Sequence, residues 1–300
     1  MTSSSSKRGE FAVIADLFAP LATHKGAYRL TDDAATLTPP RGHELVITTD
    51  ALVEGVHFLP GDRIARKALR VNLSDLAAKG AEPIGYLVAL SLPRNIRYAW
   101  LKTFARDLAK DQEEFGISLL GGDTTSTPGP LTIAITAIGH VPKGKMLLRK
   151  GAKPGDRVFV SGAIGDAGAG LALLKKGRTA PKALIDRYRL PTPRLALGKA
   201  LRGVATAALD VSDGLIADLG HISEVSKVRI LVEATHIPTA HDPVFAATAG
   251  DDYEIAFTAP AGTRIKGTTE IGRVARGRGV ALLDAKGREI PLKKQGYTHF

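Results

Sequence analysis

Side chains that carry oxygen recur along this sequence at the ends of apolar runs and in the turns that follow them. Six sets are found: Asp32 and Asp33 in LTDDAA, Thr48, Thr49 and Asp50 at the end of LVITTD, Asp75 in VNLSDLAAKGA, Asp123 after ISLLGG, Asp210, Ser212 and Asp213 in AALDVSDGL, and Asp251 and Asp252 in AGDDYEIAF. Taken alone, any one set is explained as well by a helix N-cap or a turn as by a ligand site. Because α/β proteins place ligand sites in the loops at strand ends, the recurrence indicates a common chemical role.

Many carboxylates and hydroxyls without cysteine are the ligand set of a hard cation. Mg²⁺ takes oxygen ligands and is usually bound by a few carboxylates, water and substrate phosphates. A bound cation also removes the repulsion between neighbouring carboxylates. A phosphate monoester carries about −1.5 to −2 charges at pH 7, so joining two of them requires positive charge between them. The sequence therefore predicts magnesium-assisted chemistry on phosphorylated substrates.

Other site chemistries lack their motifs. The eight histidines do not show the short fixed spacing of a zinc hydrolase, and neither G-x-S-x-G nor a Walker A motif occurs. The turn VSGAIGDAGAGLALL has the spacing G-x-x-G-x-x-G instead of the dinucleotide-binding G-x-G-x-x-G. We therefore expect Gly162, Gly165 and Gly168 to allow close packing of a strand on a helix.

Length and composition limit the class of protein. A chain of 300 residues is long enough for two domains, and its 44% apolar and 24% charged residues are ordinary for a globular protein. Residues 1–8 lack the apolar core of a signal peptide and resemble a frayed start, and no run is long enough to span a membrane. The absence of cysteine excludes disulfides and thiolate metal sites. We expect a cytoplasmic protein with no membrane partner.

The net charge of +11 raises an alternative from another class, a basic nucleic-acid-binding module with structural acidic turns. Aromatic residues make up only 5%, and the lysines and arginines are scattered apart from a loose cluster over residues 143–153. A basic chain can equally serve an anionic small substrate. We expect no nucleic-acid partner.

The elements that must position the acidic residues alternate between helix and strand. The apolar spacing predicts helices over residues 9–23, 62–79, 100–115, 181–189, 194–203 and 214–226, and a further helix after the glycine-rich turn. It predicts strands over 44–50, 84–92, 117–121, 131–141, 157–161, 206–211, 228–233, 253–258 and 279–284. Residues 142–156 are rich in Pro, Gly and Lys and are typical of a linker. We predict an α/β (α+β two-layer) fold of two domains, 1–141 and 157–300.

Seven motifs occur in an order that resembles one family. They are TTDALVEGVHF, VNLSDLAAKGAEP, LLGGDTT, LRKGAKPGD, LDVSDGLIADLGHI, GDDYEIAFT and the C-terminal GYTHF. Together they closely resemble the thiamine-monophosphate kinases, which share an ATP-binding superfamily with aminoimidazole ribonucleotide synthetase and selenophosphate synthetase. The resemblance covers nearly the whole chain. It implies an N-terminal mixed sheet with helices that forms a dimeric barrel and binds ATP and metal, followed by a C-terminal α/β domain.

The resemblance also implies an activity and a set of site residues. The activity is ATP-dependent, magnesium-assisted phosphorylation of thiamine monophosphate to thiamine diphosphate by a homodimer. The implied magnesium ligands are Asp33, Thr48, Thr49, Asp50, Asp75, Asp123, Asp210 and Asp213. The implied ATP contacts are Gly122, Asp123, Arg149 and Ser212, and the implied substrate contacts are His57, Asp251 and Tyr297.

From the residues alone, plainer roles stay open for three of these positions. Arg149 fits a solvated charge in a lysine-rich linker, and His57 fits an ordinary half-buried histidine. Tyr297 and Phe300 fit side chains that hold down the C-terminal tail.

The predicted reaction needs no side-chain nucleophile or base, because the attacking phosphate oxygen is already deprotonated at pH 7. We therefore expect direct in-line transfer that depends on positioning and charge neutralisation, without a phospho-enzyme.

The chain departs from the family pattern at three positions. Thr31 replaces the usual Gly before the paired aspartates, and Asp251 replaces the usual Glu and shortens the reach by one methylene. Lys79 replaces a usual apolar residue and adds a cation near Asp75. Within the superfamily, the absence of cysteine argues against selenophosphate synthesis and hydrogenase maturation, and the motifs match aminoimidazole ribonucleotide synthetase less well.

Overall fold

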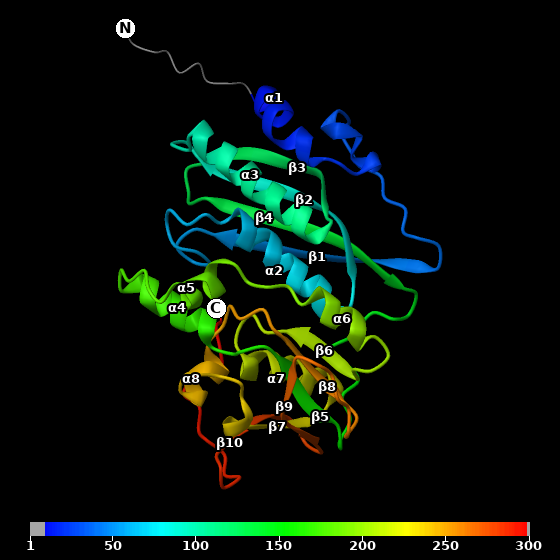
Figure 1. Cartoon of the computed structure of the whole chain (residues 1–300), viewed down its shortest axis with the longest axis vertical. Coiled ribbons are helices and arrows are strands. Elements are labelled where there is room, and N and C mark those ends of the chain that lie inside the picture. The colour runs from blue at the N-terminus through cyan, green and yellow to red at the C-terminus, as the bar shows by residue number, and fades with distance from the viewer. Residues whose placement is uncertain (1–9, 299–300) are drawn as a thin grey trace. The chain divides into compact units, whose positions relative to one another are not determined.

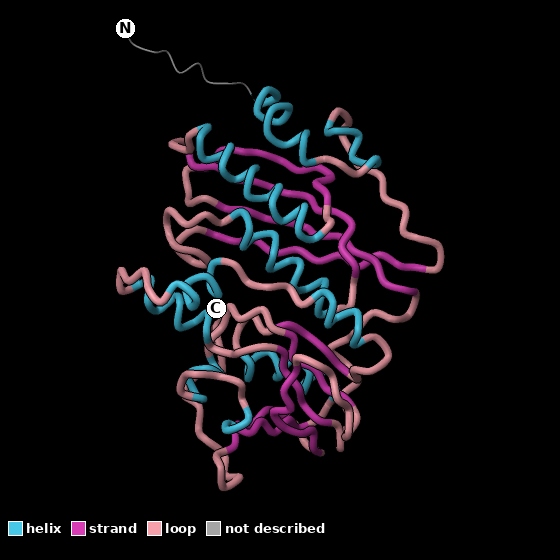
Figure 2. Tube along the Cα trace, viewed as in Figure 1, coloured by secondary structure: helices cyan, strands magenta, loops and turns pink. Residues whose placement is uncertain are grey.

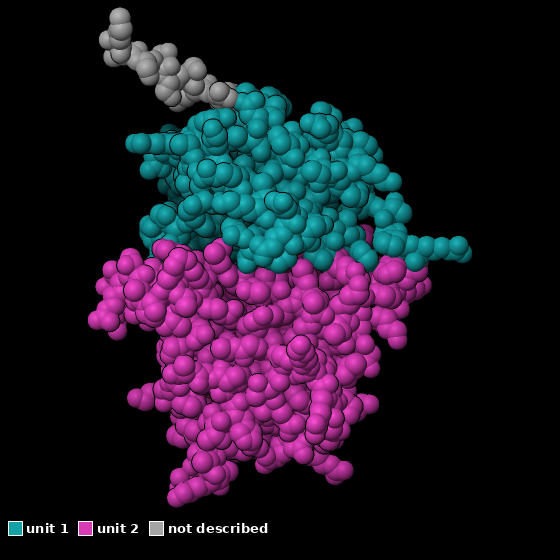
Figure 3. Space-filling view, in the orientation of Figure 1, with its two compact units in different colours: residues 1–41, 47–72, 83–140 teal, residues 42–46, 73–82, 141–300 magenta. Residues whose placement is uncertain are grey.

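A computed structural model describes residues 10–298. Residues 1–9 and 299–300, which include the predicted frayed start and Phe300, lie outside the described part. The chain divides into two compact units, coloured separately in Figure 3. The N-terminal unit takes residues 1–41, 47–72 and 83–140, and the C-terminal unit takes residues 42–46, 73–82 and 141–300. No helix of residues 10–298 is both long enough and apolar enough to cross a bilayer.

The N-terminal unit is built on a four-stranded sheet in the order β1-β4-β2-β3. The strands are β1 (His43–Val53), β2 (Glu82–Pro93), β3 (Ser118–Thr127) and β4 (Thr132–Pro142). Strands β2 and β3 are parallel, with Ala89 opposite Asp123. Helices α2 (Ala65–Ala78) and α3 (Tyr98–Phe115) cover one face of this sheet (Figure 1). The predicted strands of this half and the predicted helices over 62–79 and 100–115 are confirmed, apart from their ends.

Ion pairs fix α2 against α3. The buried carboxylate of Asp111 on α3 accepts hydrogen bonds from Arg66 Nε at 2.7 Å and from Arg70 Nε at 2.8 Å. Arg70 also lies over the ring of Phe115, 4.9 Å from its centroid. A buried carboxylate with two guanidinium partners has its charge compensated, so this pairing fixes the register of the two helices.

The opposite face of the same sheet stays largely exposed. Along β4 the odd-numbered residues Ile133, Ile135 and Ala137 are buried, as expected for the period of two in a strand. On β1, Ile47 is 63% exposed, and on β2, Leu87 is 39% exposed. Within the described residues β1 and β3 are the two edges of an open sheet, and no closed barrel is formed.

The predicted helix over 9–23 is irregular. It consists of α1 (Glu10–Val13), a π-helical turn (Ile14–Phe18) and a 3₁₀ turn (Ala19–Leu21) with Pro20 near its start. A second 3₁₀ segment, Lys25–Leu30, follows. Proline has no N–H to donate and therefore interrupts a regular helix.

The C-terminal unit holds a six-stranded sheet in the order β10-β7-β9-β5-β8-β6. Its strands are β5 (Arg157–Ser161), β6 (Ala207–Asp210), β7 (Arg229–Glu233), β8 (Ile255–Ala259), β9 (Thr268–Ala275) and β10 (Gly279–Leu283), drawn magenta in Figure 2. Its helices are α4 (Asp166–Lys175), α5 (Lys182–Arg189), α6 (Leu195–Leu201), α7 (Leu215–Ser226) and α8 (Pro243–Thr248). Neighbouring strands of this sheet are antiparallel, except that β10 and β7 are parallel.

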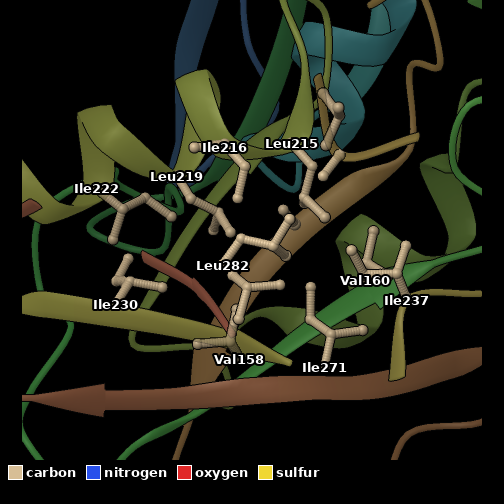
Figure 4. Close-up of a cluster of buried hydrophobic side chains, with 14 of the residues drawn as sticks. Val158, Val160, Leu215, Ile216, Leu219, Ile222, Ile230, Ile237, Ile271 and Leu282 are labelled. Carbon is tan, nitrogen blue, oxygen red and sulfur yellow. The ribbon is translucent and has the colours of Figure 1, made fainter. Parts of the chain in front are cut away.

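Both faces of this sheet are packed. Val158 and Val160 of β5 belong to the apolar cluster that contains Leu219 of α7 (Figure 4). Phe159, between them in sequence, belongs to a second cluster and stacks on Phe257 with 5.1 Å between ring centroids. Because successive side chains of a strand point to opposite faces, the middle of β5, residues 158–160, is apolar at every position. That continuous apolar run is why the strand was predictable from the sequence.

Candidate active site

The loop after β6 brings together predicted residues that lie far apart in the sequence. Asp210 is the last residue of β6. The next residue, Val211, accepts a hydrogen bond from Tyr253 N at 2.8 Å, and Ser212 O accepts one from Asp251 N at 2.8 Å. These bonds place the predicted substrate residue Asp251 beside the predicted ATP residue Ser212.

Two glycines let neighbouring segments approach this loop closely. A Cβ on Gly250 would lie 2.5 Å from Ser212 O, and a Cβ on Gly296 would lie 2.6 Å from Asp213 O. Such contacts exclude any larger residue at either position. The next residue, Tyr297, donates its N–H to Asp213 O at 2.9 Å. The C-terminal segment is therefore held against the loop, and the Tyr297 side chain is 43% exposed beside it.

Asp218, which the sequence analysis did not select, fixes the shape of the loop. It lies in the first turn of α7 and is buried. Its Oδ2 accepts the backbone N–H groups of Ser212, Asp213 and Gly214 at 3.0, 3.0 and 3.1 Å. Burial, followed by the Asp213 charge, raises the pKa of Asp218 to about 7. An acidic residue in the first turn of a predicted helix was the available signal.

Asp210 and Asp75 form a carboxylate pair in the C-terminal unit. The last turns of α2, from Leu73 onward, belong to this unit and carry both Ser74 and Asp75. The hydroxyl of Ser74 donates to Asp210 Oδ2 at 2.8 Å. Burial, and then the neighbouring Asp75 charge, hold the pKa of Asp210 well above its usual value. A buried carboxylate next to a second carboxylate is a donor set that fits a divalent cation.

A further group of possible ligands lies at the start of α7. One carboxylate oxygen each of Asp213 and Asp218 and one ring nitrogen of His221 lie within 4.8 Å of one another. His221 was not among the predicted ligands. Since Asp218 already accepts three N–H groups, its first role is to hold the loop. Asp213 is the only residue of this group that the sequence analysis predicted as a metal ligand.

Arg149 lies close to β6. The backbone of Leu148 accepts a hydrogen bond from Ala208 N at 2.8 Å, and Leu147 N donates to Lys79 O at 3.1 Å. The segment before Arg149 is thus bonded both to β6 and to the residue that follows α2. Arg149 itself is exposed.

Glu254 is a buried carboxylate that bonds to several distant segments, and the sequence analysis did not select it. Its carboxylate accepts hydrogen bonds from Ser161 Oγ at 2.6 Å, Arg187 Nη2 at 2.7 Å and Arg194 Nε at 2.7 Å. Its backbone oxygen accepts from Val211 N at 2.8 Å. Glu254 therefore links β5 and α5 to the loop after β6, which no local sequence pattern indicates.

In the N-terminal unit, the prediction that Thr48, Thr49 and Asp50 end a strand is wrong. Strand β1 continues to Val53. Because side chains alternate along a strand, Thr48 and Asp50 share one face and Thr49 points to the other. Thr49 Oγ1 donates to Ile135 O at 3.1 Å and accepts from Thr136 Oγ1 at 3.1 Å on β4. Polar side chains are tolerated inside β1 because it is an edge strand with one exposed face.

Asp123 and Gly122 likewise lie within β3, not after its end, and Asp123 is exposed. β1 and β3 are opposite edges of the sheet, so three interstrand steps separate them. At about 4.8 Å per step, Asp50 and Asp123 of one chain are about 14 Å apart across the sheet. The two carboxylates of a single chain are too far apart to hold the same cation directly.

Asp33 and His57 complete the predicted set. Asp33 is exposed, and its backbone N–H donates to Asp32 Oδ1 at 2.8 Å. His57 lies in the turn after β1, where its Nδ1 accepts the N–H of Val53 at 3.0 Å. Because Nδ1 accepts this hydrogen bond, it carries no proton. The imidazole proton is therefore on Nε2, which is the donor nitrogen.

Family models match both halves of the chain. The N-terminal domain of AIR synthase related proteins matches residues 31–141, and the C-terminal domain matches residues 153–288. The thiamine-monophosphate kinase of Caulobacter vibrioides is 44% identical over 320 aligned positions, covering 97% of this chain and 90% of the relative.

Solved structures agree with these matches. The crystal structure of the thiamine-monophosphate kinase from Stenotrophomonas maltophilia is 40% identical with a TM-score of 0.79, covering 87% of this chain and 91% of that one. AaThiL complexed with AMPPCP and TMP is 32% identical with a TM-score of 0.81, covering 90% and 91%. The chain belongs to the thiamine-monophosphate kinase family of AIR synthase related proteins.

Proposed function

We propose that this chain transfers the terminal phosphoryl group of ATP to thiamine monophosphate and releases thiamine diphosphate. Family membership supports the activity, and the relative complexed with AMPPCP and TMP supports the two substrates. The observation that carries the proposal is the buried Asp210 beside Asp75, at the start of a loop that holds Ser212 and Asp213 and to which Asp251 is hydrogen-bonded. The shared loop lets metal, nucleotide and acceptor contacts adjoin one another.

The proposed magnesium ligands in the C-terminal unit are Asp75, Asp210 and Asp213. Those proposed in the N-terminal unit are Asp33, Thr48, Thr49, Asp50 and Asp123. Magnesium held by such residues would supply positive charge that neutralises the phosphates during transfer. The chain's own contribution is to hold the carboxylates in place, as Ser74 does for Asp210 and as Asp218 does for the Asp213 backbone.

The remaining residues position the two substrates. Arg149 and Ser212, with Gly122 and Asp123, are proposed to contact ATP. His57, Asp251 and Tyr297 are proposed to contact thiamine monophosphate. The acceptor phosphate oxygen is ionised at pH 7, so transfer is direct and in line without a side-chain base. Asp251 reaches one methylene less far than the usual glutamate, so a water molecule would bridge it to the acceptor.

The proposal includes a homodimer formed through the open face of the N-terminal sheet. Ile47 and Leu87 leave apolar surface on that face, and β1 and β3 are edges. Asp50 and Asp123 lie on opposite edges, so a second copy offers a way for carboxylates of the two edges to meet. A barrel shared between two chains would remove both edges, which an open sheet otherwise exposes.

The test is direct conversion by the purified protein. With ATP, Mg²⁺ and thiamine monophosphate, thiamine diphosphate should accumulate, and it should not when EDTA is added. Asp50→Asn and Asp123→Asn should fold and lose most turnover, whereas His57→Ala should mainly raise KM. Conversion that needs no divalent ion, or a phosphorylated protein found by isotope tracing, would overturn the proposed mechanism.

A further inference from the structure

Lys79 is a cation of the C-terminal unit to which the proposed chemistry assigns no role. It directly follows α2 and is half-buried. Its Nζ donates to Ala208 O at 3.0 Å, two residues before Asp210 on β6. Among the described residues this is its one hydrogen bond, and no carboxylate lies within 4.0 Å of it. An ammonium group has three N–H donors, so its capacity is only partly used.

A second cation is its neighbour. Leu147 N donates to Lys79 O at 3.1 Å, and Leu148 O accepts from Ala208 N at 2.8 Å, which places the following residue, Arg149, beside Lys79. Burial, and next the Arg149 charge, lower the pKa of Lys79, while Asp210 and Asp75 oppose the shift.

Two neighbouring cations that lack close carboxylate partners repel each other unless an anion lies between them. Phosphate oxygens suit this pair, because guanidinium forms forked hydrogen bonds and ammonium acts as a compact charge. The Asp75 and Asp210 carboxylates next to the pair are the proposed metal ligands. A phosphate bound to the two cations would therefore lie next to the metal that these carboxylates are proposed to hold.

We propose that Lys79 and Arg149 together bind one phosphate group of the nucleotide, so that Lys79 is a second cationic ATP contact. This inference rests on the proposed function for the identity of the anion. It assigns Lys79 a different role from that of a structural lysine, whose purpose would be the bond to Ala208 O alone.

The test compares Lys79→Gln with Lys79→Met. Glutamine keeps an N–H donor for Ala208 O but has no charge, and methionine keeps only the apolar stem. Lys286→Met is the matched control, because it removes the same charge from an exposed turn. AMPPCP and adenosine binding are measured by calorimetry with Mg²⁺ present, on protein shown to be folded by circular dichroism.

Both Lys79 variants should bind AMPPCP about tenfold or more weakly and adenosine within about twofold of the wild type, as expected for loss of a charged contact to phosphate. Lys286→Met should match the wild type for both ligands. If Lys79→Gln binds AMPPCP as the wild type does, the inference is wrong, even if Lys79→Met is too unstable to measure.

The outcome is separable from that of the proposed function. Wild-type protein that makes thiamine diphosphate while Lys79→Gln binds AMPPCP normally overturns the role of Lys79 alone. Wild-type protein that binds AMPPCP but phosphorylates no thiamine monophosphate overturns the proposed function, and a weakened Lys79→Gln then still supports the phosphate contact.

Discussion

The carboxylate of Asp218 accepts the backbone N–H of Asp213 at 3.0 Å. The same oxygen also accepts the N–H groups on either side of that residue. One buried side chain therefore determines the path of the loop that carries Asp213, although Asp218 itself needs no contact with a substrate. The loop geometry and the candidate metal ligand are linked through this single group.

Asp218→Ala should lower the free energy of unfolding by about 2 kcal/mol or more, because three backbone donors lose their acceptor. Asp218→Asn should lose less, since the amide oxygen still accepts. Urea denaturation measures both changes. Asp284→Ala is the control: Asp284 accepts the N–H groups of Lys286 and Arg288 in an exposed turn, where water can replace it. Equal losses for Asp218→Ala and Asp284→Ala would contradict this role for Asp218.

Glu254→Gln should destabilise the protein by about 3 kcal/mol, because the guanidinium groups of Arg187 and Arg194 lose a buried counter-charge. Glu289→Gln is the comparison, since the ion pair of Glu289 with Arg229 is exposed and should contribute less than about 1 kcal/mol. The free energies of unfolding of both variants are measured by chemical denaturation at one pH. A Glu254 variant as stable as the Glu289 variant would show that the buried carboxylate does not hold this unit together.

The sequence predicted elements best where one strong pattern covered the whole element. The buried run of β5 and the amphipathic helix α3 are of this kind. Strand β9, TTEIGRVA, was missed because only a few of its residues are buried, and α8 because it has six residues. Its N-cap Asp242 followed by proline was a usable signal.

The candidate site was predictable only where its residues share one local motif. Asp210, Ser212 and Asp213 share one short motif, and the structure places Asp251 and Tyr297 beside them through backbone bonds. The positioning residues Asp218 and Glu254 act across turns or between distant segments, so their partners cannot be inferred from spacing. The assignment of each site residue to metal, ATP or substrate stays a prediction.

Ile47→Glu should weaken the proposed dimer, because a buried unpaired charge would replace apolar surface on the open sheet face. Light scattering after gel filtration should show a dimer for the wild type and a concentration-dependent mixture or a monomer for the variant. Val225→Glu, on the exposed surface of α7, should behave as the wild type. A monomeric wild type, or an Ile47 variant that stays fully dimeric, would count against this interface.

Asp210→Asn should have opposite effects on stability and on activity. In EDTA the variant should be more stable by about 1 kcal/mol or more, because the burial and the Asp75 repulsion that raise the pKa of Asp210 penalise its charged form. With Mg²⁺ and ATP it should lose most of its turnover, since a neutral amide is a poorer metal ligand. Ser74→Ala, which removes the hydroxyl donor to Asp210, should instead lower stability in EDTA. An Asp210 variant that is destabilised without metal would show that the carboxylate is compensated within the chain.

The stability of the metal-free protein should fall as pH rises from about 4 to about 7. Burial raises the pKa of Asp252 to about 7 from an ordinary 3.8, so the native state binds more protons than the unfolded state across this interval. Asp252 accepts the N–H of Gly165 at 2.8 Å, which an asparagine oxygen can also accept. Asp252→Asn should therefore make the decrease of stability with pH less steep. A smaller decrease should remain, because Asp218 has a similar pKa of about 7 and contributes in the same direction.

The profile is measured by urea denaturation in EDTA at pH values between about 5 and 7, which lie between the ordinary carboxyl pKa and the raised pKa of Asp252. Asp284→Asn is the control, because backbone and side-chain hydrogen bonds from Arg288 lower the pKa of Asp284. Its contribution to stability is lost only as pH falls below the ordinary carboxyl range, so its profile over this interval should parallel the wild type. An Asp252 variant whose slope equals that of the Asp284 variant would mean that the Asp252 carboxyl is ionised in the native protein throughout this range.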